Sequence, residues 1–229
     1  MGSGLAPAGT PVAGGLPEVA SMKNGERLSA LDALVRSVPA AGSRFPQGTS
    51  AEAVFERELL QHRRLFAEIA SLRAAVCQAG ALMTDAIQRG GRLLFFGNGA
   101  AAYLAAELSE RLTRGRWPPI AMALALDSTD GGGDPQGFAR LIAANARWAD
   151  CAIAISASGR SMNVVRGLQK AHAMGVTTVG LLGCGGGAAR LLAEAPVVIA
   201  HDDRARIQEA HVFIGHIWCD QIESALGWR

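Results

Sequence analysis

Apolar residues recur at helical spacing between Ser50 and the paired glycines Gly90 and Gly91. One stripe covers residues 55–72 and a second covers residues 76–87. In both stripes the apolar positions lie three or four residues apart, as on one face of an amphipathic helix. Ser50 is a good helix-capping residue, and a glycine pair is a usual signal for a helix end. The pattern therefore predicts two helices ahead of the first strand.

Beyond Gly91 the pattern changes to short, uninterrupted apolar runs that alternate with helical stretches. The apolar runs cover residues 92–96, 120–126, 152–155, 177–182 and 197–200. The helical stretches between and after them cover residues 100–112, 138–149, 162–174 and 205–226. Apolar strands that alternate with helices are typical of a parallel sheet covered on both faces. We therefore predict an α/β protein with a doubly wound, five-stranded parallel sheet, preceded by the two helices.

The first 50 residues differ in character from the rest. They are rich in glycine, alanine and proline, which favours disorder, although residues 25–38 have the pattern of a short helix. They lack the basic start and apolar core of a secretory signal. No apolar run in the chain reaches the roughly 18 residues of a membrane span. We expect a flexible tail over residues 1–50 and one folded domain over residues 51–229.

Composition narrows the class of protein. A hydrophobic fraction of 49% with a charged fraction of 18% is typical of a soluble globular chain, and a net charge of +2 gives no electrostatic basis for binding nucleic acid. The four cysteines include no Cys-x-x-Cys pair, and three of them lie in apolar runs, where cysteine is usually a small core residue. We expect a cytoplasmic protein that binds neither nucleic acid nor membranes.

The strongest candidate site is the polar turn over residues 156–161, between the third apolar run and the next helix. Three of its residues carry hydroxyl groups: Ser156, Ser158 and Ser161. The N–H groups at the start of a helix attract an anion, Gly159 allows the backbone to come close, and Arg160 adds positive charge. Serine is also a common helix cap. Three hydroxyls after a buried strand favour a phosphate site over capping alone.

A second set of polar residues lies on the last helix. Gln208 and His216 are eight residues apart, so a rotation of about 800° leaves them on one side. Glu209 and His211 lie on neighbouring faces. A lone histidine on such a helix is usually a core residue, but Glu107 is available from another helix. A carboxylate and an imidazole together suit acid–base chemistry.

Three motifs together resemble the sugar isomerase (SIS) fold. They are Gly97-Asn98-Gly99 after the first strand, S-x-S-G-x-S over residues 156–161, and RIQEAH followed by GH in the last helix. More narrowly, they are similar to the bacterial phosphoheptose isomerases, over roughly residues 51–226. The resemblance implies an aldose–ketose isomerase that converts sedoheptulose 7-phosphate, or a similar long-chain ketose phosphate, through an enediol.

The same resemblance implies roles for individual residues. Glu107 and His216 match the acid/base pair of the family, and Gln208 matches a substrate contact. The substrate and its phosphate would be held by Asn98, Gly99, Asp134, Ser156, Ala157, Ser158 and Ser161. Family members that carry zinc bind it at the positions of Glu107, Gln208 and His216 and at a histidine that is Tyr103 here. Phenol is a poor zinc ligand, so we expect weakly bound zinc or no required cofactor.

The chemistry agrees with this resemblance. Aldose–ketose isomerisation moves a proton between adjacent carbons, which needs a base and an acid, and a phosphate anchor supplies positioning. The alternative is a non-catalytic SIS module that binds a sugar phosphate or a protein. We favour the enzyme, because a module without catalysis has no reason to keep both Glu107 and His216. Relatives are tetramers with sites between subunits, so we also expect a homo-oligomer, most simply a homotetramer.

Overall fold

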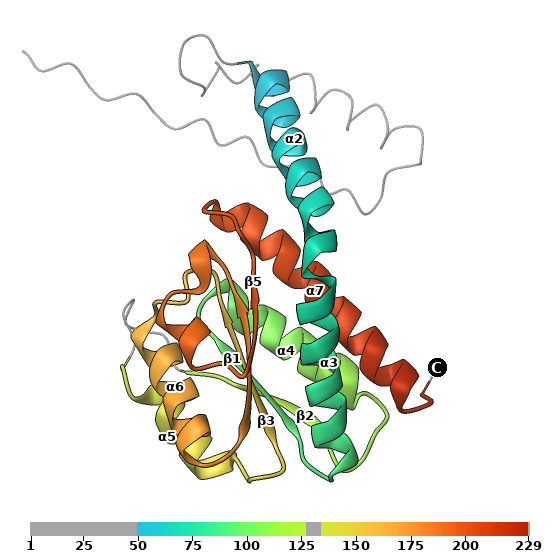
Figure 1. Cartoon of the computed structure of the whole chain (residues 1–229), viewed down its shortest axis with the longest axis vertical. Coiled ribbons are helices and arrows are strands. Elements are labelled where there is room, and N and C mark those ends of the chain that lie inside the picture. The colour runs from blue at the N-terminus through green and yellow to red at the C-terminus, as the bar shows by residue number, and fades with distance from the viewer. Residues whose placement is uncertain (1–49, 127–133, 229) are drawn as a thin grey trace, which may run out of the picture. The chain divides into compact units, whose positions relative to one another are not determined.

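The computed structural model describes residues 50–126 and 134–228 (Figure 1). The chain divides into two compact units, residues 1–54 and 55–229, and the second unit contains every strand that the structure describes. The expected tail over residues 1–50, with its short helix over residues 25–38, lies outside the described residues except for Ser50. The boundary between tail and domain therefore stays a prediction.

Both helices expected ahead of the first strand are present. Helices α2 (Ala51–Ile69) and α3 (Arg73–Gln88) are joined by the 3-10 turn η2 (Ala70–Leu72). At the start of α2, Ser50 Oγ accepts a hydrogen bond from the backbone N–H of Ala53 at 3.1 Å, so Ser50 caps this helix as predicted.

The helical run Ala51–Gln88 is long and apolar enough, by length and composition, to cross a membrane. Its most apolar stretch of 18 residues has a mean hydropathy of 1.3, whereas the sequence pattern predicted no such run. In the structure 28% of that stretch is buried, and Ala79 and Met83 of the same helical run are fully buried in the core of the fold. A core helix of a soluble protein passes the same test, so one helix of this kind is weak evidence for a membrane span.

The five predicted strands form one sheet in which every pair of neighbours is parallel. The strands are β1 (Leu93–Gly97), β2 (Ala121–Leu124), β3 (Cys151–Ser156), β4 (Thr177–Leu182) and β5 (Ala195–Val198). Their order is β2-β1-β3-β4-β5. The chain therefore moves outward from β1 to β2 on one side and from β3 to β5 on the other. The carboxyl ends of β1 and β3 form the switch point, where ligands bind in sheets of this kind.

Helices cover both faces of the sheet, as predicted. The remaining helices are α4 (Ala100–Thr113), α5 (Gly137–Asn145), α6 (Met162–Ala173) and α7 (Arg204–Ala225), with short 3-10 turns at η3 (Cys184–Gly186) and η4 (Ala188–Leu191). Helices α3, α4 and α7 pack on one face, and α5 and α6 pack on the other (Figure 1). Successive strand residues point to opposite faces, so Phe95 belongs to the first core and Phe96 to the second.

Several element boundaries differ from the prediction. Helix α5 ends at Asn145, although the pattern extended it to residue 149. The buried carboxylate of Asp150 accepts hydrogen bonds from the backbone N–H of Arg147 at 2.9 Å and of Arg92 at 2.7 Å. These bonds hold the chain in a turn that leads into β3. Strand β5 begins two residues earlier than expected and includes Pro196, which an edge strand tolerates.

Candidate active site

The serine turn after β3 is held by its own hydroxyls. Ser156 Oγ accepts a hydrogen bond from the N–H of Gly159 at 3.1 Å, and Ser158 Oγ accepts one from the N–H of Arg160 at 3.2 Å. Ser161 is the N-cap residue of α6, and its side chain makes no capping hydrogen bond. Two of the three serines therefore do shape the turn. A hydroxyl that accepts a bond still has a proton to donate, so all three keep a donor for a ligand.

Gly159 gives this turn its shape. Its φ is +60°, a conformation that residues with a side chain rarely adopt. A Cβ atom at this position would lie 2.0 Å from the backbone oxygen of Gly186, in the connection that follows β4. The serine turn therefore packs directly against the neighbouring loop, and only glycine fits at the contact.

The turn after β1 is tied to the start of α6. The side-chain amides of Asn98 and Asn163 exchange two hydrogen bonds, with N···O distances of 2.9 and 3.0 Å. Asn163 lies two residues after Ser161, so the bonds connect the Asn98 turn to the serine turn. Asn163 was not singled out in the sequence, because an asparagine in the first turn of a helix is a common residue there.

A cavity of about 280 Å³ opens between these turns and the start of α7. Seven of the ten predicted site residues line it: Asn98, Gly99, Ser156, Ala157, Ser158, Ser161 and Gln208. We call this the serine cavity. A second cavity of about 390 Å³ shares Asn98, Ala157 and Gln208 with it and extends towards Leu104 and Val212. The two cavities adjoin, so together they offer a polar end and a more apolar end.

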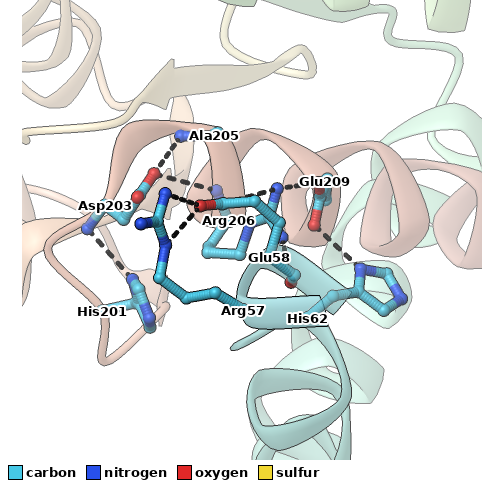
Figure 2. Close-up of polar contacts among 8 residues, drawn as sticks. All are labelled: Arg57, Glu58, His62, His201, Asp203, Ala205, Arg206 and Glu209. Atoms are coloured by element: carbon cyan, nitrogen blue, oxygen red, sulfur yellow. Dashed lines mark hydrogen bonds and ion pairs between the residues drawn. The ribbon is translucent and has the colours of Figure 1, made fainter. Parts of the chain in front are cut away.

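Arg204 is a lining residue of the serine cavity that the sequence analysis passed over. It is the first residue of α7, and no ion pair ties it to any other described residue. Asp203, just before it, caps the helix by accepting hydrogen bonds from the N–H groups of Ala205 at 2.7 Å and Arg206 at 3.4 Å (Figure 2). These bonds lower the pKa of Asp203. In the sequence, the only signal for Arg204 was the charged turn ahead of the helix. Charge alone does not show which cavity or surface a side chain faces.

The start of α7 is also fastened to α2 (Figure 2). The buried Arg206 donates from Nη1 to the backbone oxygen of Glu58 at 2.6 Å and pairs through Nη2 with Glu209 at 2.6 Å. His62 Nδ1 forms a hydrogen bond with Glu209 Oε2 at 2.8 Å. Glu209 is thus engaged on the side of α2. Its neighbour Gln208 lines both cavities.

Glu107 and His216 come together across α4 and α7, as the resemblance implies. His216 Nε2 lies 2.8 Å from Glu107 Oε1. Gly215 lets the two helices approach, because a Cβ atom there would lie 2.9 Å from Leu108 Cδ1. The pair is open to solvent, with 54% of the Glu107 side chain and 44% of the His216 side chain exposed. We call these two residues the Glu107–His216 pair.

One turn further along both helices, a second set of bonds holds α4 against α7. Arg111 Nη2 donates to Glu223 at 2.9 Å and also to Asp220. The hydrogen bond to Glu223 is the main cause of the raised pKa of Arg111. Arg111 follows Glu107 by four residues, and Asp220 follows His216 by four. This ion-pair network therefore fixes the spacing of the helices beside the Glu107–His216 pair.

The Glu107–His216 pair does not line either cavity in the described part of the chain. Gln208 and His216 share a side of α7, but eight residues correspond to about 12 Å along a helix axis. A rotation angle alone cannot show this separation. In the described part of one chain, the serine cavity and the Glu107–His216 pair are therefore two separate features.

Asp134 also lies apart from the cavities. One of its carboxylate oxygens accepts a hydrogen bond from the N–H of Gln136 at 2.9 Å, and the other pairs with Arg140 of α5. The backbone bond, and then Arg140, lower the pKa of Asp134. Among the described residues, neither cavity lining includes Asp134. Its substrate contact stays a prediction, and the geometry gives it a place at the start of α5.

The described residues of one chain bring too few zinc ligands together. They contain no group of three or more histidine, cysteine, aspartate or glutamate side chains that could hold a metal. Tyr103, at the position of the family's histidine, is 81% exposed. Gln208 is about 12 Å along α7 from His216. A catalytic zinc needs three protein ligands, so Glu107 and His216 alone are too few.

Comparison with known proteins places these features in a family. A family model described as the SIS domain matches residues 60–183. The phosphoheptose isomerase of a Nitratiruptor species is 35% identical over 181 residues, which are 74% of this chain and 97% of that protein. The phosphoheptose isomerase of Chlorobaculum parvum is 36% identical over 195 residues, 79% of this chain and 93% of that protein.

Solved structures agree with the sequence comparison. The phosphoheptose isomerase of Neisseria gonorrhoeae matches with a TM-score of 0.71 and 28% identity, over 76% of this chain and 100% of that one. The phosphoheptose isomerase of Francisella tularensis matches with a TM-score of 0.70 and 26% identity, over 77% of this chain and 100% of that one. The family model, the relatives and the fold agree, and the chain belongs to the SIS domain family.

Proposed function

We infer that this protein is an aldose–ketose isomerase that acts on a sugar phosphate, and we propose sedoheptulose 7-phosphate as the substrate. Relatives at 35% and 36% identity that match most of the folded domain are phosphoheptose isomerases. The observation that carries the proposal is the 2.8 Å contact between Glu107 and His216. A carboxylate and an imidazole in contact are the two groups that proton transfer to carbon and oxygen requires.

The serine cavity is the proposed phosphate site. Its lining contains the hydroxyl-bearing residues Ser156, Ser158 and Ser161, the last of which is the N-cap of α6, and the positively charged Arg204. Asn98 and Gln208 line both cavities, which suits them to contact the sugar chain where it leaves the phosphate. Anchoring at one end holds the reacting carbons in a defined place.

The Glu107–His216 pair is proposed to carry the protons. One group removes a proton from C1 of the ketose while O2 gains a proton, which gives the enediol. A proton returned to C2, together with loss of the proton on O1, gives the aldose. These steps balance without an oxidant. Because the described residues bring together no group of three metal ligands, we propose that catalysis needs no tightly bound zinc.

We further propose that the protein acts as a homotetramer in which the pair of one copy completes the cavity of another. The pair is about half exposed and lies outside the cavities of its own chain. Three or four residues before the pair on the same two helices lie exposed large hydrophobic side chains, with Tyr103 81%, Val212 39% and Phe213 43% exposed. A second copy that covers this surface would bury these side chains and exclude water from the reacting carbons.

A cytoplasmic location is proposed as well. All four cysteines lie within the described residues, and none forms a disulfide there. Burial raises the pKa of Cys151 and Cys219, the latter to about 12, which makes both of them unreactive as thiolates. Such cysteines suit a reducing compartment.

The test is turnover of sedoheptulose 7-phosphate, followed by NMR through the appearance of the aldose. Glu107→Gln and His216→Asn should each lower kcat by about two to four orders of magnitude, the usual contribution of general acid–base catalysis. Glu110→Gln is the matched control, since Glu110 lies on the same helix and pairs only with Arg114 among the described residues. A wild-type protein that converts no ketose phosphate would instead support the non-catalytic binding module.

A further inference from the structure

His211 is a buried histidine with no part in the chemistry described so far. It lies on α7 between Gln208 and Glu209 on one side and His216 on the other, and it is 3% exposed. His211 is one of the residues that line the second cavity, together with Asn98 and Gln208. Polar side chains at this depth are nearly always hydrogen-bonded, so each polar atom of the ring needs an explanation.

The imidazole Nε2 is buried and has no hydrogen-bond partner among the described residues. Burial lowers the pKa of His211 to about 4, and the backbone of Leu182 raises it by less. The ring is therefore neutral at pH 7, with one nitrogen as donor and the other as acceptor. In either tautomer Nε2 is a polar atom that has lost its water without gaining a protein partner.

The surroundings of His211 limit what can meet that atom. The second cavity adjoins the serine cavity through Asn98, Ala157 and Gln208. Its other walls are mostly apolar and include Leu104 and Val212. If the phosphate group of a sugar phosphate is held in the serine cavity, the carbon chain of the sugar would therefore extend towards His211. The hydroxyls of that chain can both donate to and accept from a neutral imidazole.

We propose that His211 is a substrate-binding residue whose Nε2 hydrogen-bonds to a hydroxyl of the sugar chain in the second cavity. The inference rests on the function proposed above and names a contact beyond the phosphate site. His211 carries no charge in this role, so it selects a hydroxylated chain and adds nothing to the attraction of the phosphate.

The test compares wild type with His211→Leu and His211→Gln in the full-length protein. Leucine removes the polar atom at similar size, and glutamine keeps an amide that reaches towards the position of Nε2. Calorimetry would measure the affinity for sedoheptulose 7-phosphate and for inorganic phosphate, and the melting temperature would be recorded for each protein. The leucine substitution should weaken the binding of sedoheptulose 7-phosphate about five- to tenfold, which corresponds to the loss of one hydrogen bond. Inorganic phosphate should bind equally to all three proteins.

Stability separates this role from a purely structural one. His211→Leu removes the unpartnered buried nitrogen, which favours the fold, and also the bond of the ring to the backbone of Leu182, which disfavours it, so the melting temperature should stay within a few degrees of wild type. Glutamine should restore at least part of the lost affinity. Equal affinity of wild type and His211→Leu for the sugar phosphate would overturn the proposal. A His211→Leu protein with a lower melting temperature and with equally weakened binding of sugar phosphate and inorganic phosphate would also overturn it. A wild type that binds the sugar phosphate without turnover refutes the isomerase function alone, and one that binds only inorganic phosphate refutes both.

Discussion

The proposed sharing of one site between two copies leads to a complementation experiment. The first variant carries Glu107→Gln and His216→Asn, and it keeps an intact serine cavity. The second variant carries Ser158→Ala and Ser161→Ala, and it keeps an intact Glu107–His216 pair. Each variant alone has a defect in every site. A mixed oligomer regains intact sites only if the cavity and the pair of one site come from different chains.

The structure supplies the reason and the expected size of the effect. Gln208 and His216 lie about 12 Å apart along α7, and the pair stays outside both cavities of its own chain. In an equal random mixture, half of the cavities and half of the pairs are intact. About one quarter of the shared sites should then be complete in a symmetric oligomer. The mixed oligomer should therefore show about one quarter of the wild-type activity.

The two variants would be co-expressed with different affinity tags, and oligomers carrying both tags would be purified in two steps. Conversion of sedoheptulose 7-phosphate would be followed by NMR. An equal mixture of wild type with the Glu107→Gln, His216→Asn variant calibrates the assay, because about half of its sites are complete under either arrangement. Activity of the doubly mutant mixture no higher than that of the separate variants would show that each site lies within one chain, and the sharing would be wrong.

Four further outcomes are expected. Light scattering at micromolar concentration should give the mass of a tetramer, and a monomer would refute the assembly. Ser158→Ala with Ser161→Ala should weaken binding of a sugar phosphate at least tenfold in calorimetry, since each charge-assisted bond contributes about 1.5–3 kcal/mol, while the melting temperature stays within a few degrees. Elemental analysis after dialysis against a mild chelator should find no stoichiometric zinc, because Tyr103 replaces a histidine ligand; retained zinc would contradict this. The pKa of His211 is about 4 in the fold against an ordinary 6.5, so the unfolded chain takes up a proton first as the pH falls. The free energy of unfolding should therefore drop by about 3 kcal/mol between pH 6.5 and 4, a drop absent from His211→Leu in denaturant titrations.

Local patterns in the sequence were enough to predict the elements and their order. The helical period of 3.6 residues comes from backbone geometry, and short uninterrupted apolar runs are typical of buried strands. The strands, the helices and the α/β class therefore follow from residues close together in the chain. The serine turn was predictable for the same reason, since its hydroxyls, Gly159 and the following helix are neighbours. Glu107 and His216 were paired by their similarity to the motifs of a known family.

Contacts between distant parts of the chain were decided only by the tertiary structure. The placement of β3 beside β1 puts the Asn98 turn next to the serine turn, and Asn98 meets Asn163 across 65 residues. The inward position of His211 and the place of Arg204 beside the serines depend on how α7 packs on the sheet. Helical periodicity describes the angle around an axis and says nothing of which neighbour meets each face. Packing of the apolar cores selects that neighbour, and with it the residues that share a cavity.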